Sequence, residues 1–168
     1  AQGGMASATT TTADLQVVVE SRLDTHTRSY QLRRGVKTEH YFDSLAESPN
    51  FTSQVHVLKT GTHQVNTAVL FPRDHVYGSK KLPVMMRPYG GPHGPQVQNG
   101  ALIYAIDQWF ADQGFVVIIA DNRGTGGRGP AWDHAIYQDF VTPVIDDQVS
   151  AIADVAKHFP DDIDATRV

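Results

Sequence analysis

Phe115-Val116-Val117-Ile118-Ile119-Ala120 is the longest apolar run in the chain, and it decides the fold class. A strand without alternating polar residues is typical of a parallel sheet, because helices cover both of its faces. Gly114 precedes the run, and a glycine-rich loop, Asp121 to Pro130, follows it. The run therefore predicts a strand that is buried on both faces and enters a loop at its carboxyl end.

Segments on either side extend this strand into a repeating pattern. Leu82-Pro83-Val84-Met85-Met86 is a second apolar strand, and the loop after it, Tyr89 to Pro95, contains three Gly and two Pro. Apolar residues recur at helical spacing in residues 101–113 and again in residues 142–159. The order strand, loop, helix, strand, loop, helix predicts a parallel sheet with covering helices.

Each expected helix has an apolar face and end signals. The face of the first helix consists of Leu102, Ala105, Ile106, Trp109 and Phe110. The stripe of the second consists of Ile145, Val149, Ile152, Val155 and Phe159. Thr142 and Pro143 suit the start of the second helix. Asp146 and Asp147 lie in its first turns, where the helix dipole favours negative charge.

The N-terminal part of the chain has a different character. Residues 1–13 are small and polar, so we expect a frayed end or a surface loop. Short β-branched runs follow in residues 14–71, which predicts antiparallel strands joined by turns. At the other end, residues 161–167 are polar, and the chain stops where another strand of the sheet is due. The chain therefore reads as part of a larger fold.

Composition excludes several classes of protein. The 168 residues are 40% hydrophobic and 19% charged, with a formal net charge of −4 and no basic block, which argues against nucleic-acid binding. No apolar run approaches the length of a membrane span, and the start lacks the pattern of a signal peptide. Without cysteine there is no thiolate site, and the eight histidines show no metal-binding spacing. We expect no metal or cofactor; the compartment is left open, with the cytoplasm slightly favoured.

Two loops follow the carboxyl ends of the predicted parallel strands, where open α/β sheets bind ligands. In the loop from Arg87 to Pro95, Gly90 and Gly91 would let the backbone approach a substrate. Tyr89 would present a phenol that can donate a hydrogen bond to developing negative charge. The competing interpretation is that Tyr89 is a packed structural residue.

The loop from Asp121 to Pro130 contains Gly124-Thr125-Gly126-Gly127-Arg128-Gly129, formally G-x-G-x-x-G. Dinucleotide binding requires a helix that starts inside the glycines, but Pro130 follows them. A loop with positive φ angles is the favoured interpretation. In addition, none of the eight serines stands in the G-x-S-x-G elbow that presents the nucleophile of α/β-hydrolases.

Three segments carry a family resemblance in order and spacing. They are Leu82-Pro83-Val84 with Tyr89-Gly90-Gly91-Pro92, Gly114-Phe115-Val116-Val117 with Asp121-Asn122-Arg123-Gly124-Thr125-Gly126, and Ile145-Asp146-Asp147-Gln148-Val149 with Ile163-Asp164-Ala165-Thr166-Arg167-Val168. With these motifs, residues from about 54 to 168 resemble the prolyl oligopeptidase family of serine peptidases, most closely its dipeptidyl-peptidase-IV branch.

The resemblance implies a fold and a domain division. Members of that family gate an α/β-hydrolase domain with a β-propeller. After the polar segment of residues 1–13, which its composition predicts to be flexible, the resemblance implies the last propeller strands in residues 14–47. The N-terminal half of the α/β-hydrolase sheet would follow in residues 48–168. The chain would then be truncated before the nucleophile elbow.

The resemblance also implies roles for individual residues. Tyr89 would donate its hydroxyl to the oxyanion of the tetrahedral intermediate, beside Gly90 and Gly91. Asp121 and Arg123 match a D-x-R-G segment that forms the wall of the site, with a structural role first and substrate contact second. The Ser, Asp and His of the triad would lie beyond Val168, so we expect this chain alone to hydrolyse nothing.

The function implied is that of a serine exopeptidase that releases dipeptides. Its partners would be a peptide substrate and the remainder of the catalytic domain, and the complete enzyme would be capable of forming a homodimer. Acylaminoacyl peptidase or prolyl oligopeptidase specificity is the near alternative. A non-catalytic binding module of the same fold and a nucleotide-binding protein are the other two hypotheses.

Overall fold

The computed structural model describes residues 5–12, 14–47 and 53–168. The chain divides into two compact units. Unit 1 consists of Ala1–Ser53 and Gln98–Ala105, and unit 2 of Gln54–Val97 and Ile106–Val168. The domain boundary predicted between residues 47 and 48 touches the segment 48–52, which lies outside the described residues. The division into propeller and hydrolase domains stays a prediction.

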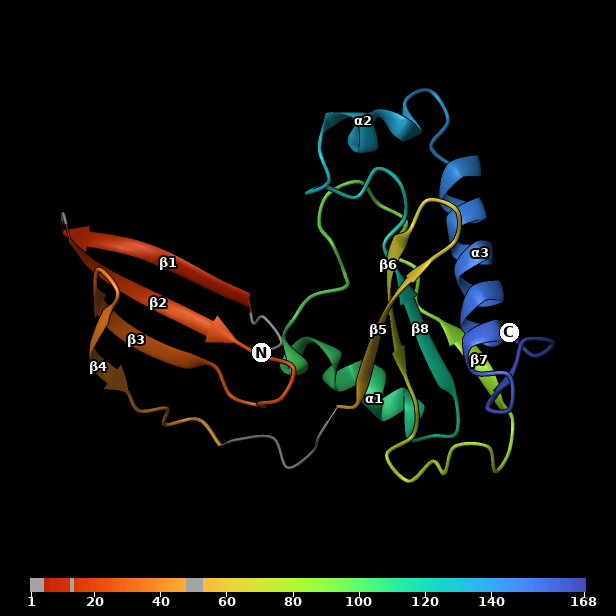
Figure 1. Cartoon of the computed structure of the whole chain (residues 1–168), viewed down its shortest axis with the longest axis horizontal. Coiled ribbons are helices and arrows are strands. Elements are labelled where there is room, and N and C mark those ends of the chain that lie inside the picture. The colour runs from red at the N-terminus through yellow and green to blue at the C-terminus, as the bar shows by residue number, and fades with distance from the viewer. Residues whose placement is uncertain (1–4, 13, 48–52) are drawn as a thin grey trace. The chain divides into compact units, whose positions relative to one another are not determined.

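Within its described residues, unit 1 contains an antiparallel sheet whose strands follow one another in sequence order (Figure 1). The strands are β1 (Met5–Thr12), β2 (Leu15–Ser21), β3 (Ser29–Arg34) and β4 (Lys37–Phe42). Val18 lies opposite Gln31 in the β2–β3 register, and these two are the buried side chains among the described positions of the sheet. The Gln31 amide donates to Ser29 Oγ at 2.8 Å. The buried face of this sheet is therefore partly polar.

Two strands of unit 1 differ from the sequence prediction. Met5–Thr12, where a frayed end or loop is predicted, forms β1 and pairs with β2 from Met5 opposite Ser21. The prediction is wrong here because an edge strand needs backbone pairing rather than an apolar face, and threonine fits an extended backbone. Strand β4 lies within residues 14–71, where antiparallel strands are predicted, but no particular run of the sequence indicates it. It follows the turn at Gly35, whose φ is +57°.

Unit 2 is built on a mixed sheet with the strand order β5-β6-β8-β7-β9. Its strands are β5 (Val55–Thr60), β6 (Val65–Leu70), β7 (Leu82–Met86), β8 (Val116–Ala120) and β9 (Ile163–Asp164). Strands β8, β7 and β9 are parallel, whereas β5, β6 and β8 pair in antiparallel fashion. The predicted parallel strands are thus present, extended by a hairpin.

Helices cover both faces of this sheet (Figure 1). α1 (Ala105–Ala111) connects β7 to β8, and α3 (Thr142–His158) connects β8 to β9. Because β8 and β9 lie on opposite sides of β7, these two right-handed crossovers run in opposite directions and leave their helices on opposite faces. The short helices η1 (Ala101–Tyr104), α2 (Pro130–Asp133) and η2 (His134–Ile136) lie in the connections.

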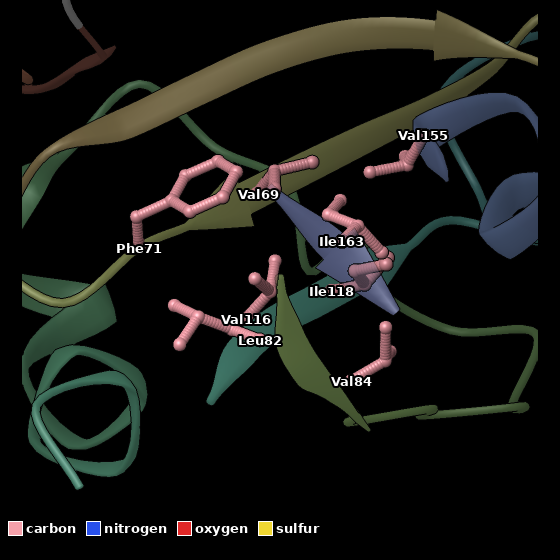
Figure 2. Close-up of a cluster of buried hydrophobic side chains, with 8 residues drawn as sticks. All are labelled: Val69, Phe71, Leu82, Val84, Val116, Ile118, Val155 and Ile163. Carbon is pink, nitrogen blue, oxygen red and sulfur yellow. The ribbon is translucent and has the colours of Figure 1, made fainter. Parts of the chain in front are cut away.

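A cluster of eight buried apolar side chains lies between the sheet and α3 (Figure 2). Val116 and Ile118 of β8 point into it together with Val155 of α3. The other members come from β6 and the residue after it, from β7 and from β9: Val69, Phe71, Leu82, Val84 and Ile163. All five residues of β8 are buried, as the unbroken apolar run predicts.

The face that each helix buries against the sheet differs from the apolar stripe predicted from its sequence. In α3 the buried residues are Val144, Asp147, Gln148, Ala151 and Val155, whereas Ile145 and Val149 are 54% and 58% exposed. In α1 the buried residues are Asp107, Gln108 and Ala111, whereas Ile106 and Trp109 are exposed. Each helix therefore buries an Asp-Gln pair and leaves part of its apolar stripe uncovered among the described residues.

The edge of the sheet beside β7 is occupied by the last residues of the chain. The amide of Leu82 donates to the Asp162 carbonyl oxygen, and that of Val84 donates to the Arg167 carbonyl oxygen, each at 2.8 Å. The polar segment 161–167 thus contains the short strand β9, which was predicted only as the place where a strand is due. Among the described residues, no helix combines the length and the apolar character needed to span a bilayer.

Candidate functional site

In unit 2, the connection that follows β7 and the connection that follows β8 run in opposite directions across the sheet. The chain leaves β7 toward β8 on one side, and it leaves β8 toward β9 on the other. In an open α/β sheet, the loops on either side of such a reversal form a crevice at the carboxyl ends of the strands. Here the segments that follow β7 and β8 contain the two loops that the sequence singles out, residues 87–95 and residues 121–130.

Tyr89 lies in the first loop with its side chain 47% exposed. Its ring rests on the backbone of Gly91, since a Cβ at Gly91 would lie 2.8 Å from Cε1 of the ring. Gly90 has a φ of +70°, in the left-handed region that favours glycine. The Gly-Gly pair thus allows the loop to turn back under an accessible phenol.

Asp121 ties the two loops together. Its side chain is buried, and Oδ1 accepts hydrogen bonds from the backbone amides of Gln96 at 2.7 Å and Val97 at 3.3 Å. Burial raises the pKa of Asp121, and those two amides act in the opposite direction. A residue at the end of β8 thereby fixes the far end of the Tyr89 loop.

Arg123 is anchored to α3 rather than directed to an open site. Its guanidinium and its backbone amide both bond the buried carboxylate of Asp147, at 3.0 Å from Nε and 2.7 Å from the amide. Nη2 also donates to the Pro143 carbonyl oxygen at 3.1 Å. These bonds use much of the hydrogen-bonding capacity of Arg123. Asp147, which the sequence suggested as a charge for the helix dipole, is in fact a specific partner of this loop.

A second arginine-aspartate pair anchors the Tyr89 loop on the opposite face of the sheet. Arg87 immediately follows β7, and its Nε lies 2.5 Å from Oδ1 of Asp107 on α1. Burial raises the pKa of Asp107, and the charge of Arg87 opposes that effect. No local pattern in the sequence indicates this pair.

The glutamine beside each aspartate bonds the sheet. Gln108 donates to the Phe71 carbonyl oxygen at 2.9 Å, and Gln148 donates to that of Ala120 at 3.0 Å. Phe71 directly follows β6 and Ala120 is the last residue of β8, so each glutamine bonds the end of a sheet strand. The repeated Asp-Gln pair, at positions where a covering helix is expected to be apolar, is the sequence signal that could have revealed both anchors.

The two loops touch through the main chain. A Cβ at Gly126 would lie 2.9 Å from the carbonyl oxygen of His93, so glycine is required for this approach. Further along the second loop, Gly124, Gly127 and Gly129 have φ angles from +87° to +98°. These angles confirm the interpretation of the G-x-G-x-x-G sequence as a loop that needs positive φ.

The same loop is fixed at its far end by Arg128. The guanidinium lies 3.7 Å from the centroid of the Trp132 ring, and Nη1 donates to the Gln64 carbonyl oxygen at 3.1 Å. The four-residue helix α2 begins at Pro130, after the glycines rather than inside them. Across the described ranges, no cluster of three metal-ligating side chains occurs.

Comparisons with known proteins agree with this arrangement. A Porphyromonas gingivalis dipeptidyl peptidase 4 structure superposes with a TM-score of 0.78 at 23% identity, covering 99% of this chain and 25% of that one. The similarity confirms the fold class, an N-terminal α/β-hydrolase half-sheet preceded by antiparallel strands such as those that end a β-propeller.

Sequence comparison points to one family. Residues 103–168 match the model of the Prolyl oligopeptidase family. Mouse prolyl endopeptidase FAP is 31% identical over 74 residues, which are 44% of this chain and 10% of that protein. Human dipeptidyl peptidase 8 is 29% identical over 130 residues, which are 75% of this chain and 14% of that protein. These findings confirm the resemblance to the prolyl oligopeptidase family, and the chain spans a quarter or less of the length of each of these relatives.

Proposed function

We propose that the chain is the oxyanion-binding part of a serine peptidase that releases dipeptides from the amino terminus of peptides. The observation that carries the proposal is the half-exposed phenol of Tyr89, held by a Gly-Gly turn at the reversal point of an α/β sheet. The matches to dipeptidyl peptidases support the same reaction.

In this reaction a serine hydroxyl attacks the scissile carbonyl, and a histidine takes up the serine proton and later donates it to the leaving amine. Negative charge develops on the carbonyl oxygen. Tyr89 donates its O–H to that oxygen, which stabilises the transition state by roughly 3–4 kcal/mol. The second donor is the backbone N–H after the serine, which we assign with the triad to polypeptide beyond Val168.

Asp121 and Arg123 form the wall of the site beside Tyr89. A structural role is supported for both, because Asp121 accepts loop amides and Arg123 is engaged by Asp147 and Pro143. Gly90 and Gly91 contribute backbone rather than side chains. Tyr89 is therefore the side chain of this chain that we propose to contact the reacting carbonyl oxygen of the substrate.

The remainder of the catalytic domain is the proposed partner. The exposed apolar residues Ile145 and Val149 on α3 support it, because packed neighbours usually cover such a stripe in a complete domain. Homodimerisation of the complete enzyme is part of the same proposal. Acylaminoacyl peptidase and prolyl oligopeptidase specificities are the alternatives, and the name prolyl endopeptidase in one relative supports testing the second.

The test uses a Gly-Pro amide with a chromogenic leaving group, with and without a blocked amino terminus. We expect the 168-residue chain alone to be inactive and the complete polypeptide to cleave the unblocked substrate. The variant Tyr89→Phe should lower kcat by about 100-fold or more, because it loses one oxyanion donor. Preference for the blocked substrate would replace dipeptide release by an alternative specificity. Turnover by the isolated chain would disprove the assignment of the triad, and a complete polypeptide without turnover would favour the binding module.

A further inference from the structure

The residues that flank the Tyr89 loop, Arg87 and Gln96, contact each other, and we call this pair the neck of the loop. Arg87 stands at its start and Gln96 at its end, and Arg87 Nη1 donates to Gln96 Oε1 at 3.5 Å. The Arg87 backbone amide also bonds the Ile118 carbonyl oxygen of β8 at 3.0 Å. Residues 88–95 therefore leave the sheet beside Ile118 and return to it beside Asp121, and a side-chain hydrogen bond joins the residues that flank them.

Each side of this neck is held by a buried carboxylate from a different element. Asp107 of α1 is 2% exposed and pairs with Arg87 on one side. Asp121, which follows β8, is 4% exposed and accepts the amides of Gln96 and Val97 on the other side. Neither carboxylate lies in the loop that it holds, so the two fix that loop to the body of unit 2.

Three of the eight residues between these anchors are prolines, which fix part of the loop backbone. Pro88, Pro92 and Pro95 restrict its backbone, and the Tyr89 ring rests on Gly91. A displacement at the neck therefore moves the loop as a unit and carries the phenol with it.

We propose that Asp107, through Arg87, and Asp121 are positioning residues that set the place of the Tyr89 hydroxyl. This inference rests on the proposed function, in which that hydroxyl stabilises an oxyanion. A preorganised donor is effective only where it meets the developing charge, and a misplacement of about 1 Å can cost as much as 100-fold in rate. The two carboxylates act through the loop and do not touch the substrate.

The test is a double-mutant cycle in the complete polypeptide. Asp107→Asn keeps the shape of the side chain but removes the charge that holds Arg87. We expect it to lower kcat by about tenfold or more with KM changed by less than about twofold, since binding is retained while the donor is misplaced. In the Tyr89→Phe background, Asp107→Asn should cause no further loss, because the group it positions is already absent.

A matched control is available on the same side of the sheet. Asp112 also pairs with an arginine, Arg73, at 2.7 Å, but that pair does not hold the Tyr89 loop. Asp112→Asn should leave kcat unchanged. Arg87→Lys serves as the second variant if Asp107→Asn does not fold, since lysine keeps the charge but lacks the planar guanidinium of arginine.

The outcomes separate this inference from the proposed function. If Tyr89→Phe has no effect on kcat, the proposed role of the tyrosine fails. If Tyr89→Phe lowers kcat and Asp107→Asn either has no effect or acts additively with it, the positioning role is overturned while the tyrosine role stands. Loss of activity in Asp112→Asn to the same extent as in Asp107→Asn would also overturn it, because it would indicate general destabilisation.

Discussion

Strands β8 and β4 of the same chain differ in how far their side chains are buried. Every residue of β8 is buried, whereas five of the six residues of β4 are exposed. Strand β8 lies inside a sheet covered by helices on both faces, and its apolar side chains form much of the core. Strand β4 is held mainly by backbone pairing with β3. The burial of apolar side chains in the described chain is therefore concentrated in the sheet of unit 2, and we expect most of its folding free energy there.

The largest expected effect comes from truncation in that sheet. Ile118→Ala removes a fully buried side chain from the cluster around β8 and should lower the free energy of unfolding by about 4 kcal/mol. Leu32→Ala in the partly exposed β3 should cost about 1 kcal/mol or less. Urea unfolding of both variants measures the difference. Equal losses would show that the two sheets contribute alike.

A second experiment compares ion pairs. Asp147→Ala leaves Arg123 without its buried partner and should cost about 3 kcal/mol, because that carboxylate is 3% exposed and accepts several bonds. Asp14→Ala removes the exposed partner of Arg34 in unit 1 and should leave the urea midpoint unchanged. A large effect at Asp14 would contradict the assignment of unit 1 as the weakly stabilised unit.

A smaller effect is the pH dependence of unfolding free energy, which should have opposite signs for one aspartate variant in each unit. Burial raises the pKa of Asp121, so its contribution to stability is present below the pKa of the unfolded chain and is lost as pH rises through the folded value. Asp121→Asn should therefore gain stability relative to the parent chain as pH rises above the ordinary aspartate pKa of about 4. The hydrogen bond from Arg22 lowers the pKa of Asp24 in unit 1, so Asp24→Asn should show the opposite trend. Urea unfolding at several pH values measures both, and parallel curves for the two variants would contradict this.

Much of the fold could be predicted from short-range pattern. The run from Phe115 to Ala120, the glycine-rich loops and the two helices predict the parallel core of unit 2, and the loop positions predict where a site lies. What could not be predicted is the face that each helix turns to the sheet. A count of apolar residues favours Ile145 and Trp109, whereas the structure buries Asp147 and Gln108 because strand carbonyls and loop arginines need partners there.

The anchors of the Tyr89 loop were missed for the same reason. Arg87 and Asp107 are twenty positions apart, and nothing in the local sequence joins them. Asp121 and Arg123 stood out because they follow a strand in a familiar motif, but their partners Gln96 and Asp147 depend on how the sheet folds. Long-range pairing of polar groups is set by topology, which short-range periodicity does not specify.

The approach of Gly126 to the carbonyl oxygen of His93 has a consequence for motion. Main-chain atoms in contact cannot swing aside as a long side chain can, so the two loops shift together or stay in place. An incoming molecule thus meets a stiff rim instead of a hinged cover.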